Sequence, residues 1–132
     1  MSDDGLPHDV RVVLGTDEIV RGLKHYRRIA RQDLVRAEQA DDPDAFRRHA
    51  EARRDVYARL TEVAAEGTPD QVVRTALEAY RELPFVTGTG PTEHVEVKGR
   101  ENALENFFLM IGLEPKVRRT VRSQRVPLRP AS

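Results

Sequence analysis

The chain has 132 residues, of which 33% are charged and 39% are hydrophobic. This length provides one core, and a chain of this size buries about two-thirds of its unfolded surface without metal or disulfide support. The absence of cysteine excludes disulfide scaffolds, thiolate metal sites and cysteine nucleophiles. No run reaches about 18 apolar residues and the acidic N-terminus is unlike a secretory signal, so we expect a cytoplasmic protein without a membrane partner.

The formal net charge is zero, but the charges are unevenly placed along the chain. Residues 114–132 carry six basic residues and one acidic residue, a net charge of +5, so residues 1–113 carry −5. Two interpretations stay open: the basic segment folds back on its own acidic body, or it extends as an arm that binds phosphate groups or an acidic partner. We therefore expect an N-terminal arm (1–15), a helical domain (16–113) and a basic C-terminal tail (114–132).

The first predicted elements are a short strand and a long helix. Residues 10–14 (VRVVL) are mostly β-branched and are followed by Gly15, which indicates a strand. Thr16 is expected to cap the helix that follows, and apolar residues recur at three- and four-residue intervals as far as about Gln39.

A second long helix is predicted after a short acidic connection. Asp42 suits the N-cap and Pro43 the first helical position, while Gly67 suits a left-handed residue beyond the helix end. Because the two helices are similar in length and joined by few residues, we expect an antiparallel hairpin. His49 and Arg53 share the apolar face of this helix, where they either cover its rim or reach a ligand or a neighbouring subunit.

Two further helices are predicted. Thr68 and Gln71 have the spacing of a capping box, and the helix that they start is expected to end before Pro84. The fourth helix, from Arg100 to Gly112, carries apolar residues in nearly every direction around its axis. A helix of this kind is normally buried, so we interpret it as the central helix or as one that enters a partner chain. Its candidate interaction residues are Phe107, Phe108 and Met110.

Between these helices, residues 84–99 contain the glycines and prolines of turns. Residues 94–98 (HVEVK) alternate like a strand and have residues 10–14 as a candidate partner. The predicted fold is therefore mainly α, with a helical hairpin and two further helices in a small bundle. A short two-stranded β ribbon is added if the two strand candidates pair.

No established catalytic or metal-binding pattern occurs in the sequence. The four histidines lack the spacing of a metal site, the serines lie in or near the termini, and the glycines around residue 90 do not complete a phosphate-binding loop. We therefore assign no catalytic, cofactor or metal residues. One local alternative is an enzyme or ligand-binding site in the 87–96 loop and the start of the fourth helix, formed by His94, Glu96 and Glu101.

We predict a non-enzymatic helical protein-interaction module that associates with itself or with another protein and carries a basic C-terminal docking arm. The arm is expected to form a short basic amphipathic helix over about 115–123. An alternative is a small nucleic-acid-binding regulatory protein that uses the same basic residues to contact phosphates. The candidate residues of the arm are Lys116, Arg118, Arg119, Arg122 and Arg125.

Overall fold

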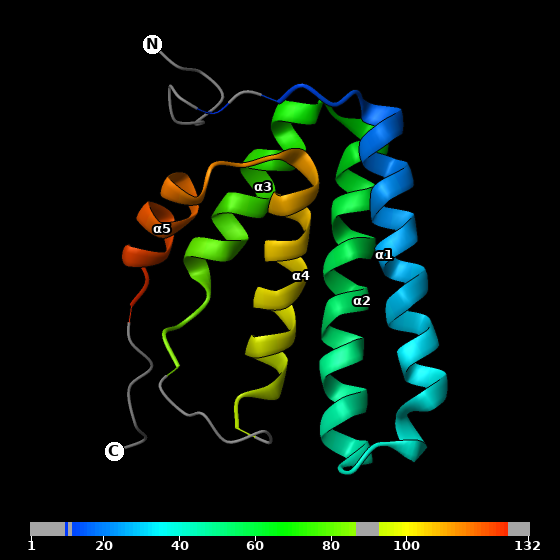
Figure 1. Cartoon of the computed structure of the whole chain (residues 1–132). Coiled ribbons are helices and arrows are strands. Elements are labelled where there is room, and N and C mark those ends of the chain that lie inside the picture. The colour runs from blue at the N-terminus through cyan, green and yellow to red at the C-terminus, as the bar shows by residue number, and fades with distance from the viewer. Residues whose placement is uncertain (1–9, 11, 87–92, 127–132) are drawn as a thin grey trace.

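The computed structural model describes residue 10 and residues 12–86 and 93–126 of the chain. These residues form five α-helices and one short 3₁₀ helix, and none of them lies in a β-strand (Figure 1). The elements are α1 (Thr16–Arg36), η1 (Ala37–Gln39), α2 (Pro43–Glu66), α3 (Pro69–Glu82), α4 (Val95–Ile111) and α5 (Pro115–Ser123). The prediction of a mainly α fold is confirmed.

Helices α1 and α2 form the predicted antiparallel hairpin and pack against each other along their length (Figure 1). The N-cap of α1 is Gly15 and not the threonine after it, and the Gly15 N–H donates to the Glu18 carboxylate over 3.1 Å. The regular helix ends at Arg36, and the tighter turn of η1 covers the rest of the predicted length. At the start of α2 the Asp42 carboxylate accepts a hydrogen bond from the Ala45 N–H over 3.0 Å, as predicted for its N-cap.

The α2–α3 connection confirms one predicted signal and corrects another. Thr68 and Gln71 form the predicted capping box, because each side chain accepts a hydrogen bond from the backbone N–H of the other residue. Gly67 was predicted to be left-handed, but its φ of −131° is extended. The next residue already caps α3 in an extended conformation, so the chain leaves α2 without a left-handed turn.

Residues 94–98 do not form the predicted strand, because α4 already begins at Val95. Residues 10 and 12–14 are not in a strand either, so the ribbon is absent from the described part of the chain. The sequence of residues 94–98 fits a helix as well as a strand, because Val95 and Gly99 are one helical turn apart and both are buried. A Cβ on Gly99 would come within 2.7 Å of the His49 carbonyl oxygen, which shows how closely α4 approaches α2.

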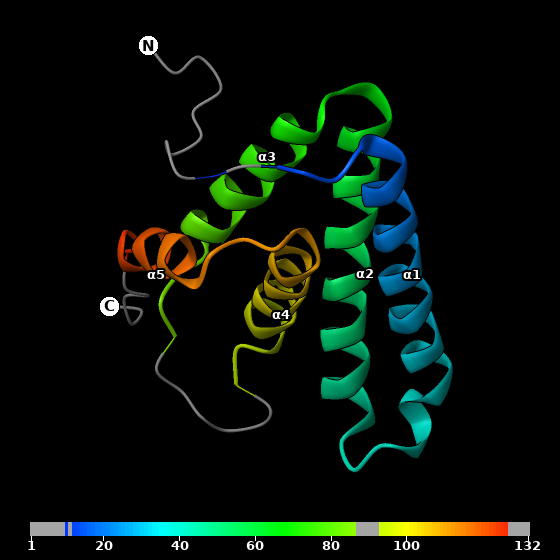
Figure 2. The same ribbon diagram turned by 45° about the horizontal axis from the view of Figure 1, so that its top comes forward.

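Helix α4 lies between the α1–α2 hairpin on one side and α3 and α5 on the other (Figure 2). Its aromatic residues Phe107 and Phe108 are fully buried in a core to which α1, α2, α3 and α5 also contribute. The Tyr80 ring of α3 meets the Phe108 ring edge-on, with ring centroids 5.2 Å apart. The helix ends at Gly112, whose φ of 73° is the left-handed conformation that glycine favours. These contacts match the interpretation of α4 as the central helix.

The C-terminal segment packs against the other helices and does not stand apart from them. Helix α5 begins at the expected proline, contacts α3 and buries Val117 in the core. Beyond it, the Phe85 N–H donates to the Val126 carbonyl oxygen over 3.3 Å. Residues 115–126 therefore contribute to the same folded unit as the helices before them.

Candidate functional site

The aromatic candidate interaction residues of α4 pack in the core of the chain. Phe107 and Phe108 lie in the core, and Met110 is half-buried with its sulfur close to Gly22 of α1. The large apolar side chain of α4 that stays outside is Leu109, which is 71% exposed. A self-association seam on α4 would therefore have to use Leu109 and not the two phenylalanines.

Two of the five basic candidates of the C-terminal segment are bound within the chain. The Glu101 carboxylate of α4 accepts from Arg122 over 3.2 Å and from Arg125 over 2.6 Å. Arg125 is only 5% exposed, donates to the Tyr80 carbonyl oxygen over 2.8 Å, and lies 4.2 Å from the centre of the Tyr80 ring. The same tyrosine donates its hydroxyl proton to Glu105 over 2.7 Å, and burial together with this bond raises the pKa of Tyr80.

The other three basic candidates face outward to different degrees. Lys116 and Arg119 are exposed and Arg118 is half-buried. No ion pair within residues 10, 12–86 and 93–126 involves any of these three side chains. Three of the five basic candidates of the predicted docking arm therefore have no ion pair within the described residues, while Arg122 and Arg125 hold the C-terminal segment against α3 and α4.

The residues of the predicted ligand site are held by different partners. Loop residues 87–92 lie outside the described residues, and His94 is exposed at the start of α4. Glu96 accepts two hydrogen bonds from the Arg48 guanidinium, over 2.8 and 2.9 Å, and these bonds lower the pKa of Glu96 and raise that of Arg48. Glu101 instead binds the arginines after α4. No group of three metal-binding side chains is found among the residues that the structure describes.

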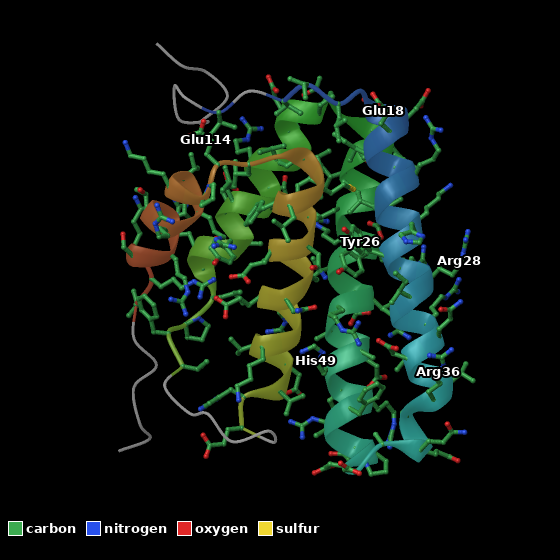
Figure 3. All side chains as sticks on the ribbon, in the orientation of Figure 1. Glu18, Tyr26, Arg28, Arg36, His49 and Glu114 are labelled. Atoms are coloured by element: carbon green, nitrogen blue, oxygen red, sulfur yellow. The ribbon has the colours of Figure 1, made fainter. Side chains whose placement is uncertain are left out.

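A second basic surface lies on α1, outside the candidate site residues predicted from the sequence, although Arg28 and Arg31 belong to the charged helix faces that could set the register of paired chains. Arg21, Lys24, Arg28 and Arg31 follow one another at intervals of three, four and three residues, which places them in one row on the helix surface. We call this row the α1 basic face. All four residues are exposed, and Figure 3 shows Arg28 on the side of α1 that is turned away from α2.

The charge of the α1 basic face is not neutralised by the residues that the structure describes, since none of their ion pairs includes its four side chains. Asp33 is the one acidic residue between Arg21 and Arg36, and it is bound to Arg53 of α2 over 2.7 Å. Like charges one turn apart destabilise a helix by roughly 0.2–0.5 kcal/mol per pair. The like charges of this face therefore lower the stability of α1 by a small amount.

The spacing of the α1 basic face is visible in the sequence, but comparable rows of charge occur on most exposed helices. The three-dimensional arrangement adds that, within the described residues, no ion pair involves these four cations, which is also true of Lys116, Arg118 and Arg119. No protein-family model matches the chain, and no curated protein or solved structure is significantly similar to it. None of the helices in the described part of the chain combines the length and hydropathy needed to cross a bilayer.

Proposed function

We propose that this chain is a non-enzymatic helical protein-interaction module that binds an acidic partner through the α1 basic face. The observation that supports this proposal is the exposed row of four cations with no ion-pair partner among the described residues. At a rise of 1.5 Å per residue, the row from Arg21 to Arg31 is about 15 Å long. This length fits an acidic helix or extended segment that carries several carboxylates in line.

The chemistry of the row favours oxyanions. Three of its four residues are arginines, whose planar guanidinium groups bind carboxylates or phosphates through paired hydrogen bonds. Two copies of this chain that met through this face would bring like charges together, which costs binding energy. The proposed partner therefore presents an acidic surface to this face, and a symmetric pair of copies would use another surface, such as the one around Leu109.

A second candidate function is binding to the phosphate backbone of nucleic acid, which the single straight row of cations also favours. Phosphate contacts release condensed counterions, so affinity falls steeply with salt. Four such contacts predict a slope of about −3.6 for the logarithm of the binding constant against the logarithm of salt concentration.

Fluorescence anisotropy with a labelled Glu-rich peptide and a labelled DNA duplex tests both candidates. The double variant Arg28→Glu/Arg31→Glu is expected to weaken peptide binding by at least about tenfold. The matched control Lys116→Glu/Arg119→Glu reverses two exposed charges on α5 and is expected to change binding less than about threefold.

The outcomes of this titration distinguish between the two candidate functions and between the two basic surfaces. Preference for the peptide supports the protein-interaction module, whereas tighter binding of the duplex with the predicted salt slope favours the second candidate. A larger loss in the α5 control would return the binding function to the C-terminal arm. Failure of the wild-type chain to bind either probe at low salt would overturn both candidates.

A further inference from the structure

A cleft with a volume of about 680 Å³ opens at the hairpin end of the molecule, far along the chain from the α5 segment. Its walls come from the α1–α2 connection, the first turns of α2 and the first turn of α4. We call it the hairpin cleft. Small-molecule sites typically have volumes of about 300–1,000 Å³ and combine apolar walls with a few polar groups. The hairpin cleft has the size and the composition of such a site.

The apolar part of the hairpin cleft is formed by Ala45 and Phe46 of α2 and Val95 of α4. Ala45 and Val95 are almost fully buried, whereas Phe46 is 36% exposed. An exposed phenylalanine beside two buried apolar residues provides a surface on which an aliphatic or aromatic group gains energy by leaving water.

The polar part is a pre-arranged network on α2. Arg53 donates from Nε to His49 Nδ1 over 3.0 Å and from Nη2 to the Asp33 carboxylate over 2.7 Å. Because Nδ1 accepts this bond, the neutral His49 ring carries its proton on Nε2. Burial, reinforced by the nearby Arg53 charge, lowers the pKa of His49 and keeps the ring neutral near pH 7.

The Nε2 proton of His49 remains available to a ligand. Within the described residues, the one hydrogen bond of His49 is the bond that Nδ1 accepts, and the ring lies between α2 and α4 at the cleft wall (Figure 3). Lys98 lines the same cleft, and its charge acts on His49. The positive end of the α4 dipole also lies at this wall, because Val95 is the first residue of the helix.

We propose that the hairpin cleft binds a small organic monocarboxylate with an apolar body. The carboxylate accepts a hydrogen bond from His49 Nε2 and is attracted by Lys98, while the apolar body packs on Phe46 and Val95. Asp41 and Asp42 also line the cleft, and the second of these already caps α2. Their negative charges oppose anionic ligands in proportion to the charge of the ligand, so a phosphate ester is disfavoured more than a monocarboxylate.

Amide chemical-shift mapping on the full ¹⁵N-labelled chain tests this proposal with three probes that share one apolar body: 4-phenylbutyrate, 4-phenylbutylamine and 4-phenylbutanol. We expect the carboxylate to shift the signals of residues 45–53 and 95–98. It should bind at least about fivefold more tightly than the amine or the alcohol, because a charged acceptor strengthens the His49 bond.

Two variants and a matched control locate the interaction. His49→Leu removes the donor and is expected to weaken 4-phenylbutyrate binding by about tenfold. Phe46→Ala removes the exposed apolar wall and should weaken all three probes by about fivefold without disturbing the fold, because this side chain is not in the core. His25→Leu changes an exposed histidine on α1 and should leave binding unchanged.

The proposal is overturned if 4-phenylbutyrate shifts no signals of the cleft, or if the amine binds as tightly as the carboxylate. Shifts confined to Arg21–Arg31 would also overturn it, because they would show that the carboxylate binds to the α1 basic face and not in the cleft. The first two results do not bear on the acidic partner proposed for α1, which is tested with separate variants, whereas the third would agree with that proposal.

Discussion

Arg125 and Arg28 are the same side chain in opposite surroundings. Arg125 follows α5, is 5% exposed, and is held by Glu101, the Tyr80 carbonyl oxygen and the Tyr80 ring. Arg28 lies on the α1 basic face, exposed and without an ion pair among the described residues. This contrast shows that a local excess of arginine does not by itself identify a binding surface. What matters is whether a carboxylate or a carbonyl of the same chain is within reach.

The largest effect is expected from removing Arg125. Breaking a buried ion pair by removing one partner typically costs about 3–5 kcal/mol, because the remaining charge is left without compensation. Glu101 keeps Arg122 and some exposure, so we expect Arg125→Ala to lower the free energy of unfolding by about 3 kcal/mol, measured by urea denaturation. The exposed control Arg119→Ala should change it by less than about 0.5 kcal/mol. Equal effects of the two variants would contradict the structural role of Arg125.

The next largest loss of stability is expected from a substitution at Gly99 of α4. Gly99 lets α4 approach α2, and a Cβ there would meet the His49 carbonyl oxygen at 2.7 Å, where backbone has to move. We expect Gly99→Ala to destabilise the fold by about 2 kcal/mol in the same urea experiment. The matched control is Gly22→Ala, whose Cβ would meet the flexible end of Met110 and should cost clearly less. Comparable losses of unfolding free energy in the two variants would show that α4 does not pack more tightly against α2 than against α1.

A smaller effect on stability is expected from pH, through the protonation of the half-buried His49. Burial and the charge of Arg53 lower the pKa of His49 in the folded state, so the unfolded chain binds this proton more readily. The stability contributed by the neutral ring is present above the unfolded pKa of about 6.5 and is lost as the pH falls through the lower folded value. His49→Gln should remove this part of the pH dependence. An unchanged slope between wild type and His49→Gln in urea titrations would contradict the assignment.

The smallest effect on stability is expected on the α1 basic face itself. Arg28→Ala/Arg31→Ala removes like-charge neighbours, so the free energy of unfolding should stay the same or rise by a few tenths, about 0.2–0.5 kcal/mol. Added salt should stabilise the wild type slightly more than the double variant, since screening removes the same repulsion. A loss of stability above about 1 kcal/mol in the double variant would mean that these arginines have partners within the chain.

The hairpin and the capping box of α3 could be predicted because their signals are local. Asp42 and Thr68 act on backbone groups three residues away, and the apolar spacing of α1 and α2 repeats over many turns. The strand predicted at residues 94–98 was wrong because five alternating residues are too few to distinguish a strand from the start of a helix. The helical conformation of this segment depends on its packing against α2, which no local sequence pattern indicates.

The contacts of the C-terminal arginines could not be predicted from the residues next to them in the sequence. Arg125 binds groups that lie 24 and 45 residues earlier in the chain, on two different helices. Its buried position also means that truncation after residue 113 would remove Val117 and Arg125 from the folded unit. Point substitutions therefore test the C-terminal arm better than deletion does.

The proposed role of the α1 basic face is tested most directly by mapping where an acidic ligand binds on the intact chain. Amide chemical-shift mapping of the ¹⁵N-labelled protein with the Glu-rich peptide should shift signals of residues 21–31 and leave those of residues 115–125 nearly unchanged. Shifts that cluster on residues 115–125, with none on α1, would contradict the claim that α1 is the available basic surface.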